Sequence, residues 1–144
     1  MIAIGSDHGG YALKQTVIRF LEEKGYEYKD FGCYSLDSCD YPVFGRAAAQ
    51  AVASGECEKG IVICTTGIGI SMTANKVAGI RCALCSDTLS AKMTRLHNDA
   101  NVLAMGAGIV GNNLALDIVE TFLTTEFSND ARHQRRIDLI EGEQ

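Results

Sequence analysis

Short apolar runs alternate with longer amphipathic stretches along the chain. Most of the runs have the unbroken apolar character of strands buried on both faces, and strands are predicted over residues 2–5, 26–31, 60–64, 80–85 and 101–105. Between and after them, a helical period predicts helices over 12–23, 43–53, 71–77, 88–96, 114–124 and 131–140. This alternation predicts an α/β fold in which helices cover both faces of a five-stranded parallel sheet, a three-layer αβα sandwich.

Length and charge narrow the class of protein. The 144 residues suffice for one domain, predicted over residues 1–144, without a linker or repeat. The net charge of −5 does not favour nucleic acid or anionic membranes, so an anionic ligand needs a local positive cluster. No apolar run approaches the roughly 20 residues of a spanning helix, and the first residues lack the features of a signal peptide. We expect no membrane contact and a cytoplasmic location.

The six cysteines are expected to be free thiols, as is usual in a reducing compartment. Only Cys82 and Cys85 have a C-x-x-C spacing, and they fall in a predicted strand. Residues three apart in a strand point to opposite faces, which argues against a zinc pair or a redox motif. No metal site is predicted.

The carboxyl ends of the predicted strands are where ligands bind in such a sheet. Cys64 ends the third strand and is followed by a glycine-containing loop and a predicted helix. It is either a small core residue or a reactive thiol, because a helix start stabilises a thiolate and loop amides can form an anion hole. Asp7 and His8 follow the first strand, either as an ordinary capped turn or as functional groups at the same rim.

Two further polar clusters lie elsewhere. His97 and Asn98 fall between a helix and the fifth strand, which places them at the opposite, amino-terminal rim. They belong to an ordinary loop, or they serve the site of a neighbouring subunit in a dimer with shared active sites. Arg132 and Arg136 share a face of the last helix because they are four residues apart. They form a solvated face or a phosphate clamp.

Residues 106–111 match G-x-G-x-x-G between a strand and a helix. The dinucleotide fingerprint also needs a following strand with an acidic residue about 20 positions on, and an arginine-bearing helix follows instead. We interpret the glycines as a tight, closely packed turn. A nucleotide-binding module that uses them is the alternative from another functional class.

Six motifs together resemble the ribose-5-phosphate isomerase B family, part of the ribose/galactose-6-phosphate isomerases, from residue 2 to about 140. They are Asp7-His8, Asp40-Tyr41-Pro42, residues 64–71 (CTTGIGIS), Asn75-Lys76, residues 97–101 (HNDAN), and Arg132-His133-Gln134-x-Arg136. The resemblance implies a Rossmann-like sandwich, a homodimer or tetramer with active sites between subunits, and no cofactor. It implies interconversion of ribose 5-phosphate and ribulose 5-phosphate, a reaction of pentose phosphate metabolism.

The resemblance also implies a role for each candidate residue. Cys64 would be the base that moves a proton between C1 and C2, His97 of a neighbouring subunit would help to open the sugar ring, and Asp7 would assist at the ring oxygen. Phosphate would be bound by His8 together with Arg132 and Arg136 from the partner's last helix, about 129–141. Sugar hydroxyls would contact Tyr41 and Asn98, and the enediolate would be held by Thr66 and the amides of Gly67, Ile68, Gly69, Ile70 and Ser71.

Two departures from the family pattern bear on substrate preference. Many members carry a phosphate-binding arginine where this chain has Gly108, so one phosphate ligand is missing or Arg135 replaces it. Most have glycine where this chain has Thr65, and a β-branched residue there narrows or reshapes the loop. Isomerisation of a six-carbon sugar phosphate, allose 6-phosphate or galactose 6-phosphate, is therefore the alternative. The galactose enzyme is built from two unlike subunits that tend to lose the thiol or the histidine, whereas this chain has both Cys64 and His97.

Overall fold

A five-stranded parallel sheet forms the centre of the computed structural model, which describes residues 1–142. Its strands lie in the order β2-β1-β3-β5-β4, and every neighbouring pair is parallel. The predicted fold class is confirmed. The strands are β1 (Ile2–Ser6), β2 (Tyr28–Asp30), β3 (Lys59–Cys64), β4 (Cys82–Leu84) and β5 (Val102–Gly106).

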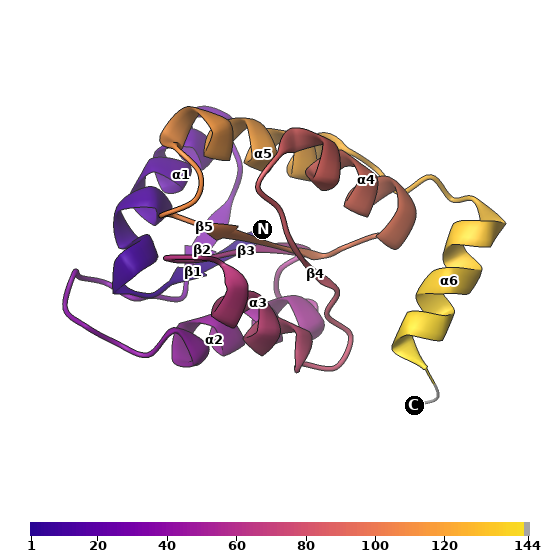
Figure 1. Ribbon diagram of the computed structural model, residues 1–144, viewed down its shortest axis with the longest axis horizontal. Coiled ribbons are helices and arrows are strands. Elements are labelled where there is room, and N and C mark those ends of the chain that lie inside the picture. Colours follow the sequence, from indigo (N-terminus) through magenta and orange to yellow (C-terminus); the bar gives the residue numbers. More distant parts are fainter. Residues whose placement is uncertain (143–144) are drawn as a thin grey trace.

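Helices cover both faces of the sheet (Figure 1). They are η1 (His8–Gly10, a 3₁₀ turn), α1 (Tyr11–Glu23), α2 (Tyr41–Ala53), α3 (Ile68–Asn75), α4 (Thr88–Asn98), α5 (Asn112–Thr124) and α6 (Ala131–Glu141). One buried cluster joins α1, α4 and α5 to the sheet, and a second joins α2 and α3 to its other face. Successive strand residues point to opposite faces, so Ile63 enters the first cluster and Cys64 enters the second.

Several predicted element boundaries differ from the structure by one to three residues, including the second strand, predicted over 26–31 and observed over 28–30. Three of these differences bear on the site. Helix α3 begins at Ile68 and not at residue 71, because Gly67 turns the chain in the left-handed region (φ 77°) directly before it. Helix α2 begins at Tyr41, ahead of Pro42, whose missing N–H costs nothing in a first turn. Strand β4 is shorter than the predicted 80–85. The Arg81 N–H donates to a side-chain oxygen of Asn101 at 2.8 Å, outside the β4–β5 ladder.

A crevice forms where β1 and β3 lie side by side. The helix after β1, α1, packs on one face of the sheet, and the helix after β3, α3, packs on the other. The connections therefore separate at the carboxyl ends of these two strands. In open α/β sheets this switch point is where ligands bind.

A buried lysine ties α1 to the segment after β2. The Lys14 side chain is 0% exposed, and its ammonium donates to Oδ1 of Asp30 at 2.7 Å and to the carbonyl of Cys33. Asp30 also accepts from the N–H of Gly32 at 2.9 Å. Because the ammonium has no access to water, its charge depends on Asp30 for compensation.

We expect Asp30→Ala to lower the free energy of unfolding by about 3 kcal/mol, since it leaves the Lys14 charge buried without its partner. Urea unfolding at neutral pH measures this loss. The matched control is Glu56→Ala, which breaks the exposed ion pair between Lys29 and Glu56 (side chains 51% and 45% exposed) and should lower the free energy of unfolding far less. Equal losses in the two variants would show that the burial of Lys14 does not matter.

Candidate active site

The thiol of Cys64 lies at the carboxyl end of β3, against the start of α3. The side chain is buried, and its Sγ accepts a hydrogen bond from the N–H of Gly67 at 3.1 Å. This hydrogen bond holds the sulfur at the start of α3. This position, at a strand end and a helix start, is the one that the hypothesis of a reactive thiol requires.

Glycines bring the loop after Cys64 close to the end of β5. A Cβ at Gly67 would lie 2.5 Å from Cδ1 of Leu84 and 2.7 Å from the carbonyl carbon of Met105. A Cβ at Gly106 would lie 2.5 Å from the carbonyl carbon of Thr66. The first glycine of the G-x-G-x-x-G match is thus explained by packing, and β5 is the last strand in residues 1–142. This supports the interpretation as a tight turn.

The predicted amide donors of this loop differ in what they contact. The N–H of Ser71 makes the first bond inside α3, to the carbonyl of Gly67 at 3.1 Å, and its hydroxyl donates to the carbonyl of Ile68 at 2.7 Å. The N–H of Ile68 donates to the Thr66 hydroxyl at 3.2 Å. The amides of Gly69 and Ile70 lie in the first turn of α3, before the Ser71 amide that makes the first bond inside the helix. They therefore point out of the amino-terminal end of α3. Of these two residues, Gly69 lines the cleft, and an amide at a helix start is suited to a negative charge.

An open cleft of about 480 Å³ lies over the thiol. It is lined by residues of α2, β3 and α3 and of the turns after β1 and β3: Asp7, Tyr41, Cys64, Thr65, Thr66, Ile68, Gly69 and Met72. Thr65 and Met72 were not predicted as site residues. Met72 follows Ile68 by four positions, so the spacing on α3 was the available signal.

Asp7 and Tyr41 are held in the cleft by local contacts. The buried carboxylate of Asp7 accepts from the N–H of Gly10 at 3.0 Å, so it caps the turn and lines the cleft at once. The Tyr41 ring packs on Gly69, where a Cβ would lie 2.5 Å from Cζ of the ring.

His8 has a defined orientation at the start of η1. Its Nδ1 accepts from the backbone N–H of Cys39 at 3.2 Å. A neutral ring that accepts at Nδ1 carries its proton on Nε2, which is then free to donate. Burial raises the pKa of the Cys39 thiol, so this neighbouring sulfur stays protonated. We name residues 7, 8, 41 and 64–71 the cysteine half-site.

The remaining predicted residues gather where α4 meets α6, and we name His97, Asn98, Arg132 and Arg136 the histidine half-site. His97 is exposed at the end of α4, with its ring centroid 4.4 Å from that of His133 on α6. His133 is buried, and its Nδ1 lies 2.7 Å from the hydroxyl of Ser128. Burial, followed by the charge of His97, lowers the pKa of His133. His133 was not predicted as part of a site, although it lies inside the quoted arginine motif.

One chain does not bring the two half-sites together. Cys64 ends β3 at the carboxyl edge of the sheet, whereas α4 ends just before β5 begins, at the amino edge. A strand of six residues, such as β3, spans about 17 Å between these edges. In Figure 1, α6 stands beside the sheet beyond α4. The predicted position of His97 at the opposite rim is confirmed.

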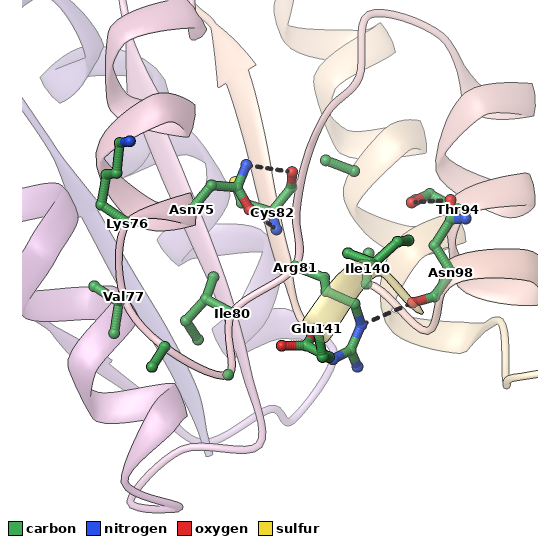
Figure 2. A pocket seen from close by; sticks show the side chains of 14 residues that line it. Asn75, Lys76, Val77, Ile80, Arg81, Cys82, Thr94, Asn98, Ile140 and Glu141 are labelled. Atoms are coloured by element: carbon green, nitrogen blue, oxygen red, sulfur yellow. Dashed lines mark hydrogen bonds and ion pairs between the residues drawn. The ribbon is translucent and has the colours of Figure 1, made fainter. Parts of the chain in front are cut away.

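A second hollow, of about 700 Å³, lies on the α6 side of the molecule. Figure 2 shows it between the end of α3, the segment leading into β4, and the ends of α4 and α6. Arg81 crosses it and donates to Glu141 at 2.7 Å, to the carbonyl of Asn98 at 2.9 Å and to the carbonyl of Asp99 at 2.8 Å. These bonds attach the end of α6 to the body of the protein.

Asn75 has a structural role beside this hollow. Its side chain donates to the carbonyl of Cys82 at 3.0 Å and accepts from the N–H of the same residue at 2.8 Å (Figure 2). This pair of bonds holds β4 against the end of α3. The Asn75 side chain thus serves the edge of the sheet.

Neither a metal cluster nor a membrane-spanning helix is found in the described part of the chain. No group of three or more histidine, cysteine or acidic residues there is arranged to hold an ion, and none of its helices is long and apolar enough to cross a bilayer. Cys82 and Cys85 are free thiols, and burial raises the pKa of Cys85 to about 11.

Comparisons with known proteins cover nearly the whole chain. Residues 2–140 match the family model described as Ribose/Galactose Isomerase. A putative sugar phosphate isomerase of Bacillus subtilis is 51% identical over 140 residues, and ribose-5-phosphate isomerase B of Escherichia coli is 47% identical over 139 residues; each alignment covers 96% of this chain and 93% of the relative. The structure of ribose-5-phosphate isomerase B from Clostridium thermocellum superposes with a TM-score of 0.95 at 56% identity, covering 97% of this chain and 94% of the other.

Proposed function

The chain belongs to the Ribose/Galactose Isomerase family, and on that basis we propose that it interconverts D-ribose 5-phosphate and D-ribulose 5-phosphate. It is an aldose–ketose isomerase of sugar phosphates. The observation that carries the proposed mechanism is the thiol of Cys64, which accepts from the Gly67 amide at the floor of the cleft.

Cys64 acts as the base in this proposal. The reaction removes a proton from the carbon next to a carbonyl and returns it to the neighbouring carbon, through an enediolate. A thiolate held by the Gly67 N–H, 3.1 Å from Sγ, takes the proton from C2 of the aldose and delivers it to C1. No covalent bond to sulfur is required, since the same group accepts and returns the proton.

The start of α3 holds the oxygens on which charge develops. The amides of Gly69 and Ile70 point out of the helix end, and the Thr66 hydroxyl lies beside them in the cleft. Donors fixed before the reaction stabilise the enediolate more than the neutral sugar. Asp7 lies next to the same cleft and assists at the ring oxygen, and Tyr41 contacts a sugar hydroxyl.

The phosphate is held at the other end of the substrate. His8 offers the proton on Nε2, and Arg132 and Arg136 of a partner subunit supply positive charge that is missing from the lining of the cleft. Binding energy at this remote group positions the reacting carbons over Cys64.

We infer that two copies of the chain share each active site. The cysteine half-site lacks a nearby arginine or a second histidine, and the histidine half-site lies at the other edge of the sheet. Three apolar side chains around the cleft are exposed to solvent: Ile68, Met72 and Leu84. Neighbouring exposed apolar side chains are typical of a surface that binds another protein. A homodimer in which α6 reaches the partner's cleft satisfies both observations, and a tetramer contains the same pair.

The reaction is proposed to take place in the cytoplasm, where the six free cysteines stay reduced.

A side-by-side assay of the purified chain tests the activity, with ribose 5-phosphate, allose 6-phosphate and galactose 6-phosphate as substrates. The largest kcat/KM is expected for ribose 5-phosphate. A larger value for a six-carbon sugar would favour the alternative substrate, and absence of all three activities would refute the isomerase assignment.

Arg136→Ala is expected to raise KM about tenfold or more with a smaller change in kcat, because the lost charge-assisted hydrogen bond holds the phosphate in both the substrate and the transition state. Steady-state kinetics with ribose 5-phosphate measure the effect. Arg19→Ala removes the same charge from the exposed face of α1 and serves as the control. A fall in kcat at unchanged KM would contradict a simple phosphate clamp.

A further inference from the structure

The side chain of Thr65 fills a notch between two turns at the carboxyl edge of the sheet. On one side is the turn after β1, where a Cβ at Gly9 would lie only 2.2 Å from Oγ1 of Thr65. On the other side is the turn after β5, where a Cβ at Gly108 would lie 3.2 Å from Cγ2 of the same residue. Both neighbours are glycines, and each leaves the space that the threonine side chain uses.

The backbone on either side of this side chain is fixed. The carbonyl of Thr65 accepts from the N–H of Gly108 at 2.8 Å, and the carbonyl of Cys64 accepts from the N–H of Ala107 at 2.8 Å. The threonine therefore cannot withdraw from the cleft by a shift of its own loop. Thr65 is exposed and lines the cleft over Cys64.

We propose that Thr65 limits the length of the sugar phosphate that the site isomerises, and that it makes the enzyme selective for five carbons over six. This inference rests on the proposed function, in which the reacting carbons lie over Cys64 and the phosphate lies at His8. Thr65 follows Cys64 directly and touches Gly9, which follows His8. The substrate chain therefore passes over the threonine side chain between its two fixed ends.

A sixth carbon lengthens the path between these ends, and the longer chain has to bend. The floor beneath it is occupied by the methyl and hydroxyl groups of Thr65. Discrimination by one carbon in a pocket of fixed shape is typically tenfold or more. Removal of the side chain beyond Cβ gives the longer chain room while leaving the proton-transfer and phosphate groups in place.

Thr65→Ala tests the proposal, with Thr65→Val as a control of nearly unchanged volume. We measure kcat/KM for ribose 5-phosphate and for allose 6-phosphate in each protein. The ratio of the six-carbon to the five-carbon value is expected to rise about tenfold in Thr65→Ala and to change little in Thr65→Val. A thermal melt of each variant checks that the turn still packs.

The possible results separate the proposed role of Thr65 from the proposed function of the chain. If the ratio of six-carbon to five-carbon kcat/KM is unchanged in a folded, active Thr65→Ala protein, the proposed role of Thr65 is wrong. If the wild-type chain isomerises neither sugar phosphate, the proposed function itself is wrong. If Thr65→Ala melts early, Gly9→Ala provides the opposite test: its added methyl pushes the Thr65 side chain into the cleft and should lower the ratio further. A ratio that rises in Thr65→Val as strongly as in Thr65→Ala would assign the effect to the hydroxyl and contradict the steric proposal.

Discussion

Cys64→Ala is expected to reduce kcat for the isomerisation of ribose 5-phosphate by about a thousandfold, because general-base catalysis by a positioned group contributes on this scale. KM should change far less, since phosphate binding does not involve the sulfur. The side chain is buried but small, so the loss of one sulfur atom should leave the fold intact. Initial rates and a thermal melt on the same preparation measure both properties.

Two further cysteine variants sharpen this experiment. Cys57→Ala removes another buried thiol at the opposite edge of the sheet, just before β3, and should keep nearly full activity. Cys64→Ser keeps a hydrogen-bond acceptor near the Gly67 amide but replaces the thiol with a hydroxyl, which is a far weaker acid. If Cys64 is the base, as proposed, this variant should be almost as inactive as alanine. A Cys64→Ser protein with normal turnover would exclude the thiolate as the base.

Mixing two inactive variants is expected to restore activity. Cys64→Ala lacks the proposed base and His97→Ala lacks the group proposed to open the sugar ring, so in the proposed homodimer each variant alone has two defective sites. In a mixed dimer, one site combines Cys64 of one chain with His97 of the other and is complete. Random pairing makes half of the dimers mixed, each with one good site of two, so about a quarter of wild-type activity should return.

The arrangement of the sites decides the result of this mixing. If Cys64 and His97 of the same chain formed the site, every site in the mixed dimer would lack one of them, and no activity would return. The chains are unfolded together in urea and refolded to exchange subunits, with each variant refolded alone as the control. Size-exclusion chromatography confirms that the active species contains two or more chains.

The sequence predicted the parallel sheet, because short apolar runs marked buried strands. The switch between β1 and β3 was not predicted, since it depends on which helix packs on which face. The start of α3 was missed because Gly69 and the β-branched Ile68 and Ile70 are weak helix formers. In the structure Ile70 is 0% exposed, and tertiary packing outweighs its low propensity.

Contacts between segments far apart in the chain could not be predicted from the hydrophobic pattern alone. Nothing in the spacing of His97 and His133 indicates that their rings lie 4.4 Å apart, because α4 and α6 meet only after the chain has completed β5 and α5. The packing of Thr65 against Gly9 and Gly108 likewise brings together the turns that follow three different strands, β3, β1 and β5. Local periodicity carries no information about such encounters.

The placement of Cys64 and His97 at opposite edges of the sheet also bears on how such an enzyme can diverge. If each site is shared by two subunits, as proposed, then after a gene duplication one copy can lose the thiol and the other the histidine, and the pair still builds one complete site between them. Each copy alone is then inactive, so selection retains the two genes together. A single-gene isomerase of this shape therefore needs only two opposite losses to become an obligate two-gene enzyme.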